Sequence, residues 1–390
     1  MAAMKEAYIS GVGQSEVGVR LERSPLLLTT DAVKEAIADA GLTIDQIDGV
    51  STYPGRSPSF LGFSPVGTDE LMDAMGIRAS WYAGGGEISS QLGALVAAVA
   101  AVRMGQARHV VCFRTVYEAA ALARPDEYPS RFDGGRVDGM QQWSMPFNAV
   151  SASTWIAQYA MRHVKKYGMT REQLAQIALT GSANAMRNPR ARAITKKQLT
   201  MDAYMESRMI SEPFCLYDCD RFSDASTVLI VSAGDALDEV SGIPVRVAAC
   251  AGSVERHSWD QAEWVAAYAT GKDLWQHTDY TPADVDTVQL YDGFSFNAIT
   301  WLEGLGFCPV GEGGRFIEGG QRIALDGELP MNTNGGQLGA GRLHGFGFAH
   351  EAVTQVRGLG GDRQIPGDPR VAVATSGGGP LATALLLARD

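Results

Sequence analysis

The chain has 390 residues, of which 45% are hydrophobic and 20% are charged, as in ordinary globular proteins long enough for two domains or one large double domain. The formal net charge is −11 and Lys/Arg runs never exceed two residues, which argues against nucleic acid as a main partner. The five cysteines are scattered and odd in number, and no signal peptide precedes them, so we expect a cytoplasmic protein with reduced thiols.

The first predicted elements alternate between strands and helices. Residues 7–13 have the pattern of a strand that ends in glycines. Glu16 stands where the third glycine of a dinucleotide-binding GxGxxG motif would be, which argues against such a site. A helix is expected to begin at Ser24 and to end at Gly41, because serine accepts hydrogen bonds from free backbone N–H groups and glycine closes helices.

A glycine-rich turn then leads into an apolar helix. The helix predicted over 92–104 has no polar face, so we expect it to be buried, and it is too short to span a bilayer. Gly85 and Gly86 precede it with bare backbone N–H groups, which favours an anion or oxyanion site. A tight turn feeding a buried helix explains the same glycines equally well. We retain both glycines as candidate substrate-binding residues.

The segment 117–151 changes character, because it is rich in Asp, Arg, Gly, Tyr and Pro and shows little periodicity. A loop of this length in a compact protein is usually a lid or a binding loop. Trp143, Met145 and Phe147 have side chains suited to contact an apolar ligand, or alternatively to anchor the loop to the body. Two helices are predicted after it, the second with a capping box at Thr170.

Three polar segments follow strands in the second half. The apolar run 288–290 ends in Tyr291-Asp292-Gly293-Phe294, and polar residues at the carboxyl end of a strand lie in the crevice of an α/β protein. The segment 332–345, which contains Gly336, Arg342 and His344, is expected to face it. A last glycine-rich turn contains Gly377 and Gly378. Alternating strands and helices in both halves predict an α/β fold with helix-covered sheets, although no exact internal repeat is visible.

The order of these motifs resembles the thiolase superfamily, in its sterol-carrier-protein thiolase-like branch. The resemblance covers nearly the whole chain and is carried by 107–113, Tyr167-Gly168, Asn184-Ala185, Asn188-Pro189, 218–226, 332–345 and 376–379. It implies a thiolase fold, with two βαβαβαββ halves in a five-layered arrangement and an inserted loop domain. The implied halves are 1–240, with the loop domain at about 115–220, and 241–390. The implied substrate is an acyl-CoA.

The departures from the thiolase pattern carry the functional argument. Thiolases have a nucleophilic cysteine at the start of the buried helix, where 87–91 has none, and a second one where this chain has Thr375 or Ser376. A Claisen condensation through an acyl-enzyme needs a thiolate. The chain therefore resembles the steroid side-chain-cleaving aldolases of the superfamily. These cleave a bulky β-hydroxyacyl-CoA by a retro-aldol reaction into a ketone and a shorter acyl-CoA, such as propionyl-CoA or acetyl-CoA.

A retro-aldol reaction needs a base for the β-hydroxyl proton and donors that hold the enolate oxygen. Tyr291 is the expected base, with a pKa lowered by Arg342. His344 or glycine-loop amides are expected donors, and His344 can also return the proton. Arg342 is always charged, so it is suited to hold a phosphate or an oxyanion. Asp292 completes the catalytic candidates, although aspartates in such positions commonly bind backbone instead. Gly336, Gly377 and Gly378 join the candidate substrate-binding residues.

The resemblance also implies partners. It implies a homodimer with the helix that begins near Ser90 close to the interface, and a zinc-ribbon/OB-fold protein that joins it in a heterotetramer. We expect no cofactor beyond the CoA thioester, and no metal. Two alternatives stay open: a thiolase-like acyltransferase with Cys308 or Ser89 as nucleophile, and a non-catalytic acyl-CoA or lipid carrier. Tyr291 and His344 favour the lyase, because a carrier does not need new acid/base groups.

Overall fold

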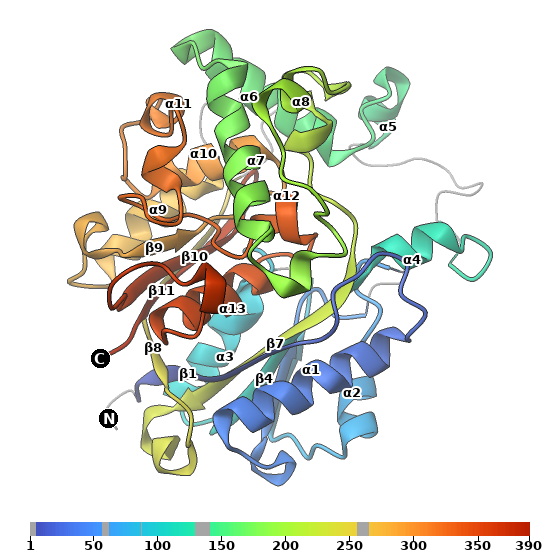
Figure 1. The fold of residues 1–390 in the computed structure, drawn as a ribbon. Coiled ribbons are helices and arrows are strands. Elements are labelled where there is room, and N and C mark those ends of the chain that lie inside the picture. Colours follow the sequence, from blue (N-terminus) through green and yellow to red (C-terminus); the bar gives the residue numbers. More distant parts are fainter. Residues whose placement is uncertain (1–4, 57–61, 87, 129–140, 256–264) are drawn as a thin grey trace.

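The computed structural model describes residues 5–56, 62–86, 88–128, 141–255 and 265–390. Within these ranges, nine strands form one sheet in the order β3-β2-β4-β7-β1-β8-β11-β10-β9. Helices cover both of its sides, and the helices of an inserted segment lie at the top of Figure 1, in green. No helix within the described ranges is both long enough and apolar enough to cross a membrane.

The elements fall into two halves and an insertion. The first half contains β1 (Ala7–Gln14), α1 (Pro25–Ala40), β2 (Gly49–Thr52), α2 (Thr68–Met75), β3 (Trp81–Gly84), α3 (Gly93–Arg103), β4 (His109–Tyr117) and β7 (Asp224–Ala233). The second contains β8 (Val245–Val254), α9 (Ala266–Gln276), β9 (Thr287–Gln289), α10 (Ser295–Gly304), α11 (Gly313–Phe316), α12 (Gly336–Ala340), α13 (Phe346–Val356), β10 (Val371–Gly377) and β11 (Leu381–Ala388). Between β4 and β7 lie α4 (Glu118–Ala123), α5 (Gln141–Ser144), α6 (Ala152–Tyr167), α7 (Arg171–Ala185), α8 (Met201–Met205), β5 (Met209–Ser211) and β6 (Phe214–Cys215).

Both halves repeat one strand order, although the sequence shows no repeat. In the first half β2 runs parallel to β4, β4 pairs antiparallel with β7, and β7 pairs antiparallel with β1. In the second half β9 runs parallel to β10, β10 pairs antiparallel with β11, and β11 pairs antiparallel with β8. The expected βαβαβαββ pattern is complete in the first half. In the second half, as far as the structure describes it, the third strand is reduced to one bridge between Val288 and Met331. β1 and β8 join the half-sheets edge to edge through two residue pairs.

Alternate residues of the strands pack on opposite sides, which produces the layers. Val111 and Phe113 of β4 belong to the core beneath α1 and α2, whereas Val110 and Cys112 belong to a core that contains α3 and α13. β10 alternates in the same way, between the core beneath α9 and α10 and the core of α3 and α13. α3 and α13 share one core with both half-sheets, so they form the middle layer. The layers are therefore α1 and α2, the first half-sheet, α3 and α13, the second half-sheet, and α9 and α10. The predicted five-layered α/β thiolase fold is confirmed.

Local sequence signals placed several helices correctly. The Ser24 side chain accepts a hydrogen bond from the Leu27 N–H at the start of α1, and Gly41 ends this helix with φ 70°. Thr170 forms the predicted capping box of α7. α3 is built almost entirely of Ala, Val, Leu and Gly, and these small apolar side chains allow it to be buried between the two half-sheets.

The inserted segment covers the second half of the sheet. α7 packs against α10 and α12, which places the insertion over the region where β9 ends. In the long predicted loop, residues 129–140 lie outside the described residues. Trp143 is 61% exposed and Phe147 is 84% exposed, so these side chains do not anchor the loop by burial in the body.

Candidate active site

The two polar segments predicted to face each other are joined by an asparagine clamp. Asn332 accepts a hydrogen bond from the Leu290 N–H (2.7 Å) through Oδ1 and donates from Nδ2 to the Leu290 carbonyl (2.9 Å). This clamp holds the loop before α12 against the residues that follow β9. The prediction that 288–294 and 332–345 face each other is therefore confirmed.

Asp292 is fully buried within this junction. Its Oδ1 accepts from the Gln337 N–H (2.7 Å) and its Oδ2 accepts from Asn332 Nδ2 (3.0 Å). Burial raises the pKa of Asp292 to about 7. Gly336 has φ 62°, and a Cβ there would lie 2.0 Å from Asp292 Oδ2. Asp292 thus holds the loop of Gly336 and Gln337, and Gly336 is a glycine because the carboxylate touches it.

Gln337 was missed by the sequence analysis, although it lies within the predicted glycine loop. It is 2% exposed, and its Oε1 accepts from the His344 N–H (2.9 Å). Its Nε2 is buried without a hydrogen-bond partner among the described residues. The same side chain favours the phenolate form of Tyr291, so it lies beside the Tyr291 hydroxyl. A buried amide donor is therefore available at this point, next to the phenol.

His344 is locked by an arginine that the sequence analysis also missed. Its Nδ1 accepts from Arg114 Nε (3.2 Å) and Nη2 (2.8 Å), and both side chains are almost fully buried. Arginine only donates, so Nδ1 carries no proton. Burial, Arg114 and Arg342 hold the pKa of His344 well below its ordinary value, so the imidazole is neutral. Its proton is therefore on Nε2, which has no hydrogen-bond partner among the described residues.

The electrostatics around Tyr291 differ from the expectation. Its N–H donates to Thr375 Oγ1 (2.8 Å), and its ring packs against Phe348 at 6.1 Å between centroids. Burial and Asp220 raise the pKa of Tyr291, and this outweighs the lowering by Arg342 and Gln337. The prediction of a lowered pKa is wrong, and Tyr291 is a protonated phenol at neutral pH.

Burial is the main cause of the raised pKa, and the partners of Arg342 add to it. Its Nε donates to Asp220 Oδ2 (2.8 Å), its Nη2 contacts Asp220 Oδ1, and its Nη1 lies 3.2 Å from Glu118 Oε1. Two carboxylates therefore compensate the charge that was expected to act on Tyr291. Glu118 Oε2 is buried and unpaired among the described residues, and burial raises the pKa of Glu118.

Serine hydroxyls meet where the resemblance places the two thiolase cysteines. Ser90, before α3, and Ser376, on β10, hydrogen-bond to each other, and the Leu92 N–H donates to Ser376 Oγ (3.1 Å). Ser90 also donates to Thr383 Oγ1 (2.8 Å). Ser89, the alternative nucleophile, is bonded to Thr383 at 2.8 Å. These hydroxyls bind one another, and within the described ranges none is bonded to a histidine or other base that activates a serine.

No cysteine has the surroundings of a reactive thiolate. All five cysteines lie within the described residues, and burial raises the pKa of each of them. The pKa of Cys308 rises to about 12, because it is packed into the core of the second half and lies near Glu303 and Glu312. The thiolate is the nucleophilic form of cysteine, and a pKa of about 12 leaves almost none of it near neutral pH, which argues against Cys308 as the nucleophile.

The remaining predicted glycines have local roles. α3 begins at Gly93, so the amides of Gly85 and Gly86 are not in its first turn, and the expected helix-terminus site is wrong in its location. A Cβ at Gly85 would meet no atom within 4 Å, which leaves its backbone accessible. The Gly378 N–H donates to the Leu381 carbonyl (3.0 Å), and the Gly377 carbonyl accepts from Trp301 Nε1 (3.1 Å). These two glycines close the turn between β10 and β11.

A basic pocket of about 380 Å³ approaches the site from the insertion. Its lining includes Lys196, Lys197 and Arg221, together with Tyr217 and Leu338, the residue after Gln337. Both lysines are exposed, and neither they nor Arg221 form an ion pair within the described part of the chain. The pocket is therefore a local positive region in a chain of net charge −11.

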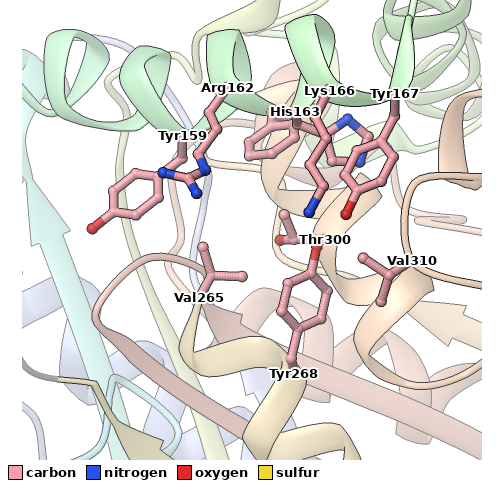
Figure 2. A pocket seen from close by; sticks show the side chains of 10 residues that line it. Tyr159, Arg162, His163, Lys166, Tyr167, Val265, Tyr268, Thr300 and Val310 are labelled. Atoms are coloured by element: carbon pink, nitrogen blue, oxygen red, sulfur yellow. The ribbon is translucent and has the colours of Figure 1, made fainter. Parts of the chain in front are cut away.

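A smaller cavity of about 30 Å³, with room for a water molecule, lies between α6 and the segment of α9 and α10. Figure 2 shows Lys166 extending from α6 between Tyr167 and Tyr268. Glu303 accepts from Tyr268 (2.8 Å) and lies 2.9 Å from His163 Nε2. None of the predicted catalytic residues lines this cavity. Among the described residues, no group of three His, Cys, Asp or Glu side chains has the arrangement of a metal site.

Comparisons with known proteins place this geometry in a family. Residues 252–388 match the family described as "Thiolase C-terminal domain-like". The chain is 31% identical to the "Steroid side-chain-cleaving aldolase" of Thermomonospora curvata, over 98% of each chain. It is also 31% identical to the "17-hydroxy-3-oxo-4-pregnene-20-carboxyl-CoA lyase" of Mycobacterium tuberculosis, over 90% of this chain and 92% of that one.

The solved structure of an "Ltp2-ChsH2(DUF35) aldolase" matches with a TM-score of 0.85 and 29% identity, over 100% of this chain and 99% of that one. The sequence likenesses extend over both halves and the insertion, and the structural likeness covers the five layers. The chain therefore belongs to the thiolase superfamily, in the branch that contains the steroid side-chain-cleaving aldolase.

Proposed function

We propose that this protein is a carbon–carbon lyase that cleaves a bulky, steroid-type β-hydroxyacyl-CoA by a retro-aldol reaction. The products are a ketone and a shorter acyl-CoA, such as propionyl-CoA or acetyl-CoA. The names of the two relatives support the reaction and the substrate class. The observation that carries the proposal is the combination of Tyr291 and an imidazole locked as an Nε2–H donor, in a site where hydrogen-bonded serines replace the two cysteines.

The reaction balances without an acyl-enzyme. The β-hydroxyl proton leaves to a base, the Cα–Cβ bond breaks, and Cβ becomes the carbonyl carbon of the ketone. The electron pair passes through Cα to the thioester oxygen as an enolate, and Cα then takes up a proton. The site must therefore hold negative charge on the thioester oxygen and manage two proton transfers.

His344 and Gln337 are the proposed donors to the enolate oxygen. His344 presents Nε2–H because Arg114 occupies Nδ1, and Gln337 has an unpaired buried Nε2 among the described residues. Both side chains are fixed by other bonds, since the His344 N–H donates to Gln337 Oε1 and Asp292 holds the Gln337 backbone. Fixed donors in a dry site stabilise developing charge strongly because they need no reorganisation during the reaction.

Tyr291 is the proposed base for the β-hydroxyl. Its raised pKa means that only a small fraction is phenolate near neutral pH, so turnover is expected to increase as the pH rises. Asp292 has a pKa of about 7 but has both oxygens occupied, which argues for a supporting role. Arg342 forms the compensated group with Asp220 and Glu118, and we propose that it orients this side of the site.

The basic pocket is the proposed site for the phosphates of CoA. Lys196, Lys197 and Arg221 supply positive charge that suits phosphate groups, and the pocket reaches Leu338 beside Gln337. A CoA thioester whose phosphates lie in the basic pocket and whose chain passes Leu338 would have its acyl group beside His344 and Gln337. Replacing Lys196 and Lys197 together by Gln is expected to raise KM for the acyl-CoA by about tenfold with little change in kcat.

We also propose that the protein assembles with partners. β3 is an edge strand with one neighbour, β2, within the described ranges, and Tyr82 on it is 64% exposed. Open edges pair readily with a second strand, which supports a homodimer near β3 and the start of α3. The name of the solved relative includes a DUF35 component, which supports a partner protein of that kind. We propose that this partner is the expected zinc-ribbon/OB-fold protein and that the assembly is a heterotetramer. Light scattering at micromolar concentration tests the dimer, and a monomer would contradict it.

The acyltransferase and carrier alternatives are less well supported. An acyltransferase of the thiolase kind needs a thiolate, and every cysteine has a raised pKa. A carrier needs neither a locked imidazole nor an unpaired buried amide, because such groups cost stability and do not improve apolar contact. Intact-mass spectrometry of the protein mixed with substrate separates these alternatives. We expect substrate turnover without a mass adduct, whereas an acyl adduct on any residue would contradict the lyase.

A further inference from the structure

The proposed lyase reaction contains one proton transfer that still lacks a residue. After the Cα–Cβ bond breaks, Cα takes up a proton, whereas Tyr291 is the group proposed for the β-hydroxyl. His344 is poorly suited to supply this proton, because its Nε2–H holds the enolate oxygen and Arg114 occupies its Nδ1. A second acid group is therefore needed close to these residues.

Tyr53 follows β2 directly, at a point where the sheet places it beside Arg114. β2 and β4 run parallel in a register that pairs Ser51 with Cys112, so Tyr53 and Arg114 are the residues two positions further along each strand. Ser51 and Cys112 face α3, since Ser51 Oγ donates to the Ala94 carbonyl (3.0 Å) and Cys112 belongs to the core that contains α3. Side chains alternate along strands, so Tyr53 and Arg114 point to this same side of the sheet.

The surroundings of Tyr53 agree with this placement. Its side chain packs against the core on which the Tyr291 ring also packs, and both tyrosines are half-buried. The charge of Arg114 acts on both phenols. A Cβ at Gly86 would lie 3.7 Å from Pro54 Cβ, so the residue after Tyr53 borders the glycine-rich turn before α3. Arg114 therefore has a phenol from each half of the chain near it, while its guanidinium holds His344.

The Tyr53 hydroxyl is available to a ligand. It forms no hydrogen bond within the described ranges, and it is not one of the polar atoms that are closed off from solvent. Burial raises the pKa of Tyr53 and outweighs the lowering by Arg114, so the phenol is protonated at neutral pH. A protonated phenol without a partner of its own is suited to act as a general acid.

We propose that Tyr53 donates the proton that Cα of the enolate takes up, an inference that rests on the proposed lyase reaction. The O–H bond of Tyr53 breaks as the Cα–H bond forms from the enolate electron pair, and the thioester carbonyl is restored. Water then reprotonates the Tyr53 phenolate, and the proton that Tyr291 took from the β-hydroxyl returns to water. Each of the two proton transfers thus has its own phenol.

Exchange of the α-protons of propionyl-CoA in heavy water isolates this step. The exchange runs the protonation of Cα in both directions without breaking a C–C bond, so it requires no base for a β-hydroxyl. Mass spectrometry of propionyl-CoA incubated with the full chain follows the uptake of deuterium. We expect uptake with the wild type and about 10²- to 10⁴-fold slower uptake with Tyr53→Phe. The half-saturating concentration of propionyl-CoA should not change, because phenylalanine keeps the ring.

Other variants distinguish this role from a structural one. Tyr8→Phe is the matched control, since Tyr8 is a half-buried tyrosine on β1 whose pKa is also raised by burial, and it should exchange like the wild type. Tyr291→Phe should slow the exchange less than Tyr53→Phe does, whereas both should lose cleavage of a β-hydroxyacyl-CoA. Circular dichroism checks folding, and Tyr53→Met provides the test if Tyr53→Phe does not fold.

The inference and the lyase reaction can fail separately. The role of Tyr53 is overturned if the wild type exchanges no α-proton, or if folded Tyr53→Phe exchanges within a few-fold of the wild type. In the second case, cleavage of a β-hydroxyacyl-CoA by the wild type would leave the lyase reaction standing. If no β-hydroxyacyl-CoA is cleaved but the exchange depends on Tyr53, the lyase reaction is wrong and the role of Tyr53 at Cα is upheld.

Discussion

Replacing Tyr291 by phenylalanine removes one hydroxyl from the centre of the proposed site. The ring is held by Phe348 and the backbone by Thr375 Oγ1, and neither contact involves the hydroxyl. The variant should therefore fold and bind substrate much as the wild type does. What it loses is the group proposed to take the β-hydroxyl proton.

The expected loss follows from the role of a positioned proton-transfer group. Such groups contribute about 10²- to 10⁴-fold to turnover, so we expect kcat of Tyr291→Phe to fall by that factor with KM little changed. The pKa of Tyr291 is raised by burial and by Asp220, so the wild-type phenolate fraction rises about tenfold per pH unit below that pKa. Wild-type kcat should accordingly rise with pH through the neutral range, and Tyr291→Phe should lose this increase.

The assay follows release of the shorter acyl-CoA by liquid chromatography and mass spectrometry across the pH range. A wild-type profile that levels off above about pH 7 would indicate a carboxylate base, for which Asp292 has the matching pKa of about 7. If Tyr291→Phe turns over within a few-fold of the wild type while His344→Ala is inactive, the base is His344 and the assigned roles are reversed.

Three other variants test the supporting structure. Arg114→Met removes the two hydrogen bonds that Arg114 donates to His344 Nδ1. It should lower kcat by about 10²-fold, because one enolate donor loses its fixed orientation. An unchanged kcat would refute this role of Arg114. Ser90→Ala should keep turnover within a few-fold of the wild type in the same assay, whereas an inactive but folded variant would make Ser90 a nucleophile. The folded-state pKa of Asp292 is above its unfolded value, so this residue should reduce stability by up to about 4 kcal/mol as the pH rises from about 4 to 7. Urea unfolding should show Asp292→Asn gaining stability relative to the wild type between about pH 5 and pH 8, and no relative gain would contradict the raised pKa.

The sequence predicted the frame of the site because its signals are local. The caps of α1 and α7, the apolar helix α3 and the polar ends of the strands depend on neighbours in the chain. Strand ends in an α/β fold converge on one crevice, so the facing of the Tyr291 and His344 segments also followed from the pattern. The shortened third strand of the second half did not, because one bridge at Met331 leaves no strand-like pattern.

The electrostatic roles were not predictable because distant residues determine them. Arg114 lies on β4 in the first half of the chain, and its side chain binds His344, which belongs to the second half. Burial and Asp220 together raise the pKa of Tyr291 and outweigh the lowering by Arg342. Gln337 is visible in the sequence as a polar residue within a glycine-rich loop. Only the fold, however, places it beside the Tyr291 hydroxyl.

The most direct test of the lyase mechanism is cleavage of a steroid-type β-hydroxyacyl-CoA in the absence of free CoA. Thiolytic cleavage needs free CoA to accept an acyl group, whereas a retro-aldol reaction needs no second substrate. With the assembled protein and any DUF35-type partner present, we predict that the ketone and the shorter acyl-CoA appear in equal amounts without added CoA, at a rate that added CoA does not increase. Product formation that depends on free CoA would contradict the lyase mechanism.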